Sequence, residues 1–203
     1  MPSALLLVLY FAALTASVAR AGDVLTVLVD GAPASPAVLR EMESEADTAL
    51  APSGITLAWR LGHDLDGKAV NGGLALIHLR GQCRAGGPVP KSSLSSSPLG
   101  RTHIADGQVL PIADVLCDAI HTLVDRDLRA ASPADRDKLL GRAIGRVTAH
   151  ELYHILLRTT VHSHRGLAHS SQSSAELLAP RSSFSEPDQR KIAQFALVIA
   201  AGR

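Results

Sequence analysis

The sequence predicts an α+β fold in which a mixed, twisted β-sheet packs on helices. Three observations support this class. A β-rich apolar run near the N-terminus precedes a helical periodicity, several further extended runs come next, and helical periodicities dominate the C-terminal half. About 180 residues remain once the N-terminal apolar segment is set aside, a typical size for one domain with a substantial core. We therefore expect one domain without internal repeats.

Strands are expected where apolar or β-branched residues form short runs. In chain order these runs are Asp23 to Asp30, Ile55 to Leu61, Gly73 to Arg80 and Arg101 to Leu110. The stretch from Ala85 to Pro98 is rich in Gly, Pro and Ser, which indicates a mobile loop before the last of these strands.

Helices are expected where apolar residues recur at helical spacing or a capping pattern opens a segment. In chain order they are about Ser35 to Leu50, Asp114 to Leu128, a helix that starts at Ser132, a helix start at Ser173, and a last helix from Ser185 through Ala200. In the first of them, Val38, Met42 and Ala46 share one face.

The helix that starts at Ser132 is the most strongly marked. Ser132 is an expected N-cap, Pro133 occupies the first helical position, and Asp135 is an acid in the first turn. One apolar face then continues into two histidines, through Leu140, Ala143, Val147, His150 and His154. Gly141 and Gly145 form a second stripe, whose small size predicts that a strand or helix packs unusually close.

Residues 150–154 read His-Glu-Leu-Tyr-His, an HExxH pentad. On a helix the imidazoles of His150 and His154 project from one face about a turn apart, so both can reach one Zn²⁺. Glu151 lies about 100° round the helix from His150, close enough to a metal-bound water without being a ligand. The pentad therefore predicts a zinc hydrolase with Glu151 as general base.

Catalytic zinc sites usually have three protein ligands and one open position. His162 is the expected third ligand, because it is the first histidine after Thr159 and Thr160, where the helix is expected to fray. His164 is the first alternative, since residues two apart share a face of an extended segment. Glu176 ranks third, at a spacing similar to that of the glutamate ligand in thermolysin-like enzymes.

The N-terminus predicts export. An apolar run over residues 4–18 is too short to span a bilayer comfortably, and Ala19-Arg20-Ala21 is a small-x-small cleavage site. We expect residues 1–21 to be a signal peptide and residues 22–203 to be the metallohydrolase domain. The mature protein is then secreted or periplasmic, without stable membrane association.

The chain has two cysteines, Cys83 and Cys117. An even number in an oxidising compartment predicts a disulfide, which would close a loop of roughly 35 residues and stabilise by about 3 to 4 kcal/mol. Neither cysteine belongs to a C-x-x-C pair, so redox catalysis and a thiolate zinc site are not expected.

Charge and aromatic content argue against a nucleic-acid partner. The formal net charge is +1, with Lys and Arg dispersed. Beyond residue 21 the aromatic residues are Trp59, Tyr153, Phe184 and Phe195. Because Tyr153 lies within the pentad, the role of oxyanion stabiliser would fall to His103, His164 or Arg165.

The pentad and its surroundings resemble known zinc proteases. HELYH followed by a threonine, a histidine three residues later and a Gly-Leu-Ala turn resembles little-characterised secreted bacterial proteins. The order of elements resembles the N-terminal half of metzincin-like zincin proteases, in which an extended peptide substrate pairs with the strand before the active-site helices. The resemblance assigns that edge to Leu99-Gly100-Arg101 and the strand after it.

The sequence departs from the metzincin pattern in two places. Leu157 and Thr160 stand where the metzincin continuation of the pentad has glycine and histidine. Met42 is the only methionine beyond residue 21, so no Met-turn can lie beneath the metal. The expected function is a secreted zinc metallopeptidase acting on peptide or protein substrates. The alternative is a non-catalytic secreted domain that binds zinc for structure.

Overall fold

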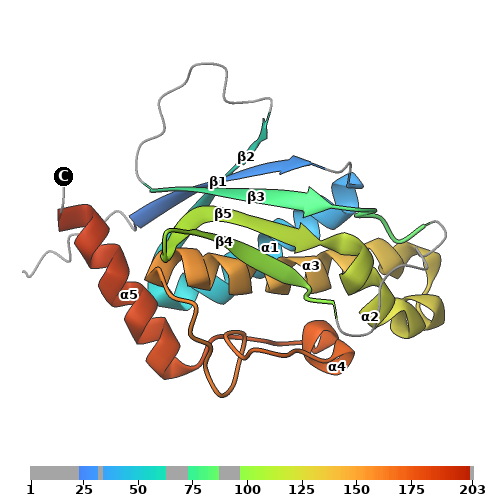
Figure 1. The fold of residues 1–203 in the computed structure, drawn as a ribbon. Helices are drawn as coiled ribbons and strands as arrows, with labels where there is room; N and C mark the ends of the chain where they lie inside the picture. Colours follow the sequence, from blue (N-terminus) through green and yellow to red (C-terminus); the bar gives the residue numbers. More distant parts are fainter. Residues whose placement is uncertain (1–22, 32–33, 63–72, 87–96, 202–203) are drawn as a thin grey trace, which may run out of the picture.

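The computed structural model describes residues 23–31, 34–62, 73–86 and 97–201, and Figure 1 shows its fold. The expected signal peptide lies outside the described residues. Five strands form one sheet in the order β2-β1-β3-β5-β4. They are β1 (Asp23–Gly31), β2 (Ile55–Leu61), β3 (Gly73–Arg80), β4 (Gly100–Ala105) and β5 (Gln108–Leu116). β4 runs antiparallel to β5 and the other pairs are parallel, so the expected mixed sheet is confirmed.

Helices cover one face of this sheet, where α1 and α3 lie side by side (Figure 1). The helices are α1 (Pro36–Leu50), α2 (Cys117–Ala130), α3 (Pro133–Leu157), α4 (Ser174–Leu178) and α5 (Glu186–Ala201), and η1 (Ala51–Ser53) is a short 3-10 turn. Alternate strand residues face α1 and α3 and are buried, as period-2 alternation requires: Leu25, Val27, Val29, Ala75, Ile77 and Leu79. The α+β class predicted from the sequence is confirmed.

The glycine stripe on α3 lets α1 approach closely, as expected. A Cβ on Gly141 would lie 2.7 Å from the carbonyl oxygen of Val38, and a Cβ on Gly145 would lie 2.6 Å from that of Met42. Real Cβ atoms do not come that close to backbone, so any larger residue would push the helices apart. The stripe therefore fixes how α3, which carries the pentad, packs against α1.

The expected strand from Arg101 to Leu110 is wrong, because the chain turns in the middle of it. Asp106 and Gly107 both have positive φ, 51° and 73°, and join β4 to β5 in a two-residue hairpin turn. Asp-Gly is a strong signal for such a turn, but the β-rich composition on both sides of it favours one continuous strand. The correction matters for the site, because it makes β4 a short edge strand.

The expected helix from Asp114 to Leu128 is also wrong at its start. Asp114, Val115 and Leu116 belong to β5, and α2 begins at Cys117. The apolar pattern continues across this boundary, so periodicity alone did not locate it. Ser132 does precede α3, but its hydroxyl donates to the Asp135 carboxylate at 2.6 Å and makes no cap bond to the backbone.

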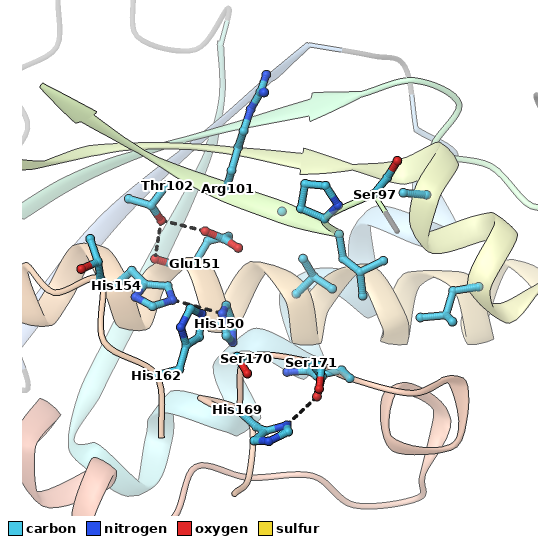
Figure 2. Close-up of a pocket in the computed structure, with 18 of the residues that line it drawn as sticks. Ser97, Arg101, Thr102, His150, Glu151, His154, His162, His169, Ser170 and Ser171 are labelled. Carbon is cyan, nitrogen blue, oxygen red and sulfur yellow. Dashed lines mark hydrogen bonds between the residues drawn. The ribbon is translucent and has the colours of Figure 1, made fainter. Parts of the chain in front are cut away.

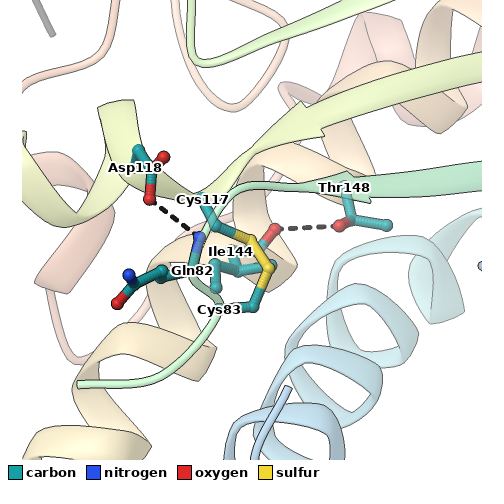
Figure 3. Close-up of a disulfide and its surroundings, with 6 residues drawn as sticks. All are labelled: Gln82, Cys83, Cys117, Asp118, Ile144 and Thr148. Atoms are coloured by element: carbon teal, nitrogen blue, oxygen red, sulfur yellow. Dashed lines mark hydrogen bonds between the residues drawn. A yellow bond between two sulfur atoms is a disulfide. The ribbon is translucent and has the colours of Figure 1, made fainter. Parts of the chain in front are cut away.

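The predicted disulfide between Cys83 and Cys117 is confirmed, and Figure 3 shows it at the start of α2. Its Cα atoms are 5.1 Å apart and both cysteines are fully buried. Beside it, the Gln82 N–H donates to Asp118 in the first turn of α2, at 2.8 Å. The bond ties the end of β3 to α2. Within the described ranges, no helix combines the length and apolarity needed to cross a membrane.

Candidate metal centre

The pentad lies on the last two turns of α3, against the sheet. Glu151 and His154 are almost fully buried, with 4% and 6% of their surface exposed, and His150 is half-buried. The helix ends at Leu157, and its C-cap Arg158 takes the left-handed conformation with φ 47°. The predicted end of the helix near Thr159 is thus correct to within two residues. The chain therefore leaves α3 within one turn of the second histidine of the pentad.

Backbone carbonyls orient both pentad imidazoles. His150 Nδ1 lies 2.6 Å from the carbonyl oxygen of Leu167, and His154 Nδ1 lies 2.7 Å from that of Thr159. A carbonyl only accepts, so each Nδ1 carries the proton and each Nε2 keeps its lone pair. The two Nε2 atoms face each other at 3.1 Å (Figure 2).

His162 lies beside this pair. Its ring centroid is 4.7 Å from that of His154 and 5.2 Å from that of His150. The three residues each offer a ligand atom, and these atoms lie within 4.8 Å of one another. Figure 2 shows His162 reaching the pentad from the loop that follows α3. The structure therefore brings together the three histidines expected as ligands.

The two alternative ligands lie elsewhere. His164 is exposed and does not join the group that could hold a metal in the described part of the chain. Glu176 closes a capping box at the start of α4, where its Oε2 accepts from the N–H and the hydroxyl of Ser173, both at 2.7 Å. These bonds lower the pKa of Glu176. They also give its carboxylate hydrogen-bond partners within the capping box, so no metal is needed to explain where it lies.

Glu151 points to the edge strand. Thr102 Oγ1 on β4 donates to its Oε2 at 2.7 Å (Figure 2). A Cβ on Gly100 would lie 2.6 Å from its Oε1, so the strand leaves space for the carboxylate. Burial raises the pKa of Glu151 to about 7, and the hydrogen bonds from Thr102 oppose that rise only in part.

Burial favours the neutral form of the His150 and His154 imidazoles. Burial lowers the pKa of His150 to about 4, and it also lowers the pKa of His154. Near neutral pH both rings are therefore uncharged, which is the form that binds a metal ion.

A cavity of about 790 Å³ runs past these residues. Figure 2 shows β4 on one side of α3 and the residues around Ser170 and Ser171 on the other. Apolar side chains from β4, α2, α3 and the segment before β4 also contribute to its lining: Leu99, Ile104, Ala119, Leu123 and Val147. Polar residues, the three histidines and Glu151 among them, make up the rest of the lining, and the size is typical of a ligand-binding cleft.

The expected oxyanion stabilisers do not lie in this cleft. His103 Nε2 is 3.1 Å from Asp114 on the opposite face of the sheet, and neither His164 nor Arg165 is among the described residues of the lining. Sequence reasoning also missed Thr102 and the two carbonyls that orient the pentad. A threonine in a strand is unremarkable in sequence, and a backbone carbonyl has no residue signature.

The fold is similar to that of a solved protein. The crystal structure of archaemetzincin from Methanopyrus kandleri superposes with a TM-score of 0.50, covering 88% of this chain and 98% of that chain, at 12% sequence identity. At that identity the likeness concerns the fold alone. No protein-family model and no curated protein matches the sequence.

Proposed function

We propose that the chain is a secreted zinc-dependent metallopeptidase, with His150, His154 and His162 as ligands and Glu151 as general base. The observation that carries the proposal is the pair of Nε2 atoms at 3.1 Å, because both Nδ1 protons are already donated to carbonyls. Two lone pairs at that distance repel unless a cation lies between them. Nitrogen ligands of one tetrahedral zinc are about 3.3 Å apart, given Zn–N bonds of about 2.0 to 2.1 Å.

The donor chemistry fits zinc. Neutral imidazole is a favoured zinc ligand, and second-shell carbonyls that fix the tautomer are usual at such sites. The likeness of the fold to archaemetzincin supports the same class of site. Zinc held there would polarise a scissile carbonyl and lower the pKa of a water towards 7. Three protein ligands would leave one position open, as catalytic zinc sites require.

Glu151 is suited to the proton transfers of peptide hydrolysis. A base is most effective with a pKa near the working pH, and burial raises the pKa of this carboxyl to about 7 in the metal-free chain. The attacking water would give its proton to Glu151, which would pass it to the leaving amine. Thr102 holds Oε2 at 2.7 Å and so limits the positions that the carboxylate can take.

β4 provides a place for an extended substrate. It is one of the two edge strands of the described sheet, and it borders the cleft that contains the histidines. An extended peptide that pairs with this edge would gain main-chain hydrogen bonds without any requirement on its side chains. Such pairing would bring a peptide bond close to Glu151, which contacts the same strand through Thr102.

Secretion is part of the proposal. The apolar run and small-x-small site over residues 4–21 support export, and the Cys83–Cys117 disulfide is consistent with an oxidising compartment.

Zinc titration of four alanine variants tests the site. His154→Ala and His162→Ala should both weaken zinc binding by at least tenfold, because each removes a ligand. His164→Ala and Glu176→Ala should bind zinc like the parent. The first controls for the loss of a histidine, and the second controls for the loss of a carboxylate. A His162→Ala protein with parental affinity would contradict the assignment of the third ligand.

The rival function is a non-catalytic domain that keeps zinc for structure. Both functions require the histidines, but a structural site would be closed by a fourth ligand, for which His164 is the candidate, and would not hydrolyse peptides. A chain that is fully loaded with zinc and leaves every peptide intact would favour the rival.

A further inference from the structure

His162 is held differently from the other two histidines. His150 and His154 each donate Nδ1–H to a carbonyl, whereas the described contacts of the His162 ring are with those two rings alone. His162 is also exposed, while His154 is buried. Among the described residues no carbonyl bonds the His162 ring, so the position of the ring depends on the backbone of the loop that carries it. Contacts outside the three histidines must therefore hold the loop that carries His162.

The residue next to His162 is anchored to α5. The Ser163 hydroxyl donates to Asp188 Oδ1 at 2.6 Å, and the Ser163 N–H donates to the carbonyl of Ala168 at 2.8 Å. Asp188 lies in the first turn of α5 and is only 1% exposed. Figure 1 shows the start of α5 beside the loops that follow α3. A buried carboxylate thus reaches within one residue of the third histidine.

The Asp188 carboxylate also accepts a hydrogen bond from Ser185, just before α5 begins. Asp188 Oδ2 accepts from the Ser185 hydroxyl at 2.5 Å, and the Asp188 N–H donates to Ser185 Oγ at 3.4 Å. Lys191 lies 3.5 Å from Oδ1. Ser163 and Ser185 therefore each donate one hydroxyl hydrogen bond to the same buried carboxylate, and Ser185 also accepts the Asp188 N–H. Only Ser163 belongs to the loop that carries His162.

We propose that Asp188 is a positioning residue for the third zinc ligand and acts through Ser163. This inference rests on the proposed function, in which His162 binds zinc. The bond from Ser163 fixes the backbone beside His162 before metal arrives, so less conformational entropy is lost when the imidazole binds. Outer contacts of this kind typically change metal affinity by 10- to 100-fold. We expect about tenfold here, because the bond acts on the neighbouring residue.

Two serine variants separate positioning from stability. Ser163→Ala and Ser185→Ala each remove one hydroxyl from the same buried carboxylate, so Ser163→Ala should lower the free energy of unfolding by about 1 kcal/mol and Ser185→Ala by at least as much, because it also loses the bond from the Asp188 N–H. Zinc titration should then distinguish them. Ser163→Ala should weaken zinc binding about tenfold, Ser185→Ala should stay within about twofold of the parent, and Ser163→Thr, which keeps the hydroxyl, should restore affinity.

A double-mutant cycle tests the route through His162. In a His162→Ala background, Ser163→Ala should have no further effect on zinc affinity, because the ligand that it positions is already gone. Equal weakening by both serine variants, or an undiminished effect of Ser163→Ala in the His162→Ala background, would overturn this inference alone. A parent chain that binds no zinc would instead overturn the proposed function, and with it the inference.

Discussion

β4 contacts a buried carboxylate on each of its two faces, and the two are held in opposite ways. On the face covered by helices, Thr102 donates neutral hydrogen bonds to Glu151. On the other face, Arg101 and His103 bind Asp114, which Arg80 of β3 binds as well. The exposed fractions are almost equal, 4% for Glu151 and 1% for Asp114. Little of either side chain is in contact with solvent, but Glu151 lies deeper in the protein than Asp114.

The hydrogen-bond partners of the two carboxyls also differ, and the two pKa values reflect both differences. For Glu151, burial raises the pKa to about 7, since a hydroxyl compensates little of the lost hydration. For Asp114, burial also raises the pKa, but the hydrogen bonds from Arg80, Arg101 and His103 outweigh it and lower the pKa to about 2. Asp114 is thus a fixed anion that ties β3, β4 and β5 together, whereas Glu151 can exchange a proton near neutral pH. One strand supports a structural carboxylate and a candidate base.

The largest expected effect is on hydrolysis by Glu151→Gln. The variant keeps the shape of the side chain and the contact with Thr102 but removes the base, so the rate should fall by about 10² to 10⁴ while zinc content is unchanged. Glu176→Gln is the matched control, because glutamine also completes a capping box and should leave the rate unaltered. Parallel loss of zinc in Glu151→Gln would show that Glu151 is a ligand.

Asp114→Asn should affect stability and leave the chemistry intact. Removing the charge weakens three charge-assisted bonds, so we expect the free energy of unfolding to fall by about 2 kcal/mol in denaturant titrations. Asp106→Asn is the control, since Asp106 is exposed at the tip of the same hairpin, where asparagine tolerates positive φ. Loss of hydrolysis in an Asp114→Asn protein that has full zinc loading and parental stability would show that Asp114 has a role in the chemistry as well as in the structure.

Thr102→Val should have a smaller effect on the rate. Valine keeps the β-branched shape that suits the strand and loses only the hydroxyl that orients Glu151, so we expect about a tenfold lower kcat with unchanged zinc affinity. Thr102→Ser should recover most of the rate. A Thr102→Val enzyme as fast as the parent would mean that Glu151 needs no help from β4.

A pH titration of the zinc-free protein should show opposite signs for the two carboxyls. The folded state binds the Glu151 proton more tightly than the unfolded state does, so its contribution to stability is full below pH 4.5 and is lost as pH rises to about 7. The contribution of Asp114 is full above pH 3.8 and is lost as pH falls to about 2. The difference in unfolding free energy between the parent and each variant, Glu151→Gln or Asp114→Asn, isolates each contribution. If both contributions to the unfolding free energy changed in the same direction as pH rose, the comparison between the two carboxyls would be contradicted.

The sequence predicted most of what lies within single elements. The pentad, the proline that begins α3, the glycine stripe and the cysteine pair each carry a local or compositional signal, and the structure has them where expected. It failed where an apolar run crosses a boundary, at the hairpin turn after Ala105 and at the start of α2.

What the sequence did not predict was the surroundings of the site. The carbonyls of Thr159 and Leu167 orient the histidines, but any residue type supplies a carbonyl. The bond between Ser163 and Asp188 joins residues 25 apart in sequence, and serine and aspartate are both common residues in loops and helix caps. Such contacts depend on how the elements pack, and a single sequence does not reveal that.

Hydrolysis by the zinc-loaded chain tests the central claim most directly. The protein without residues 1–21 would be loaded with one equivalent of zinc, freed of excess metal and incubated with a peptide library, and the products would be identified by mass spectrometry. We predict new peptide termini that disappear when a chelator removes the zinc and return when zinc is restored. A fully loaded sample that produces no new termini would contradict the account and leave a zinc-binding domain without catalysis.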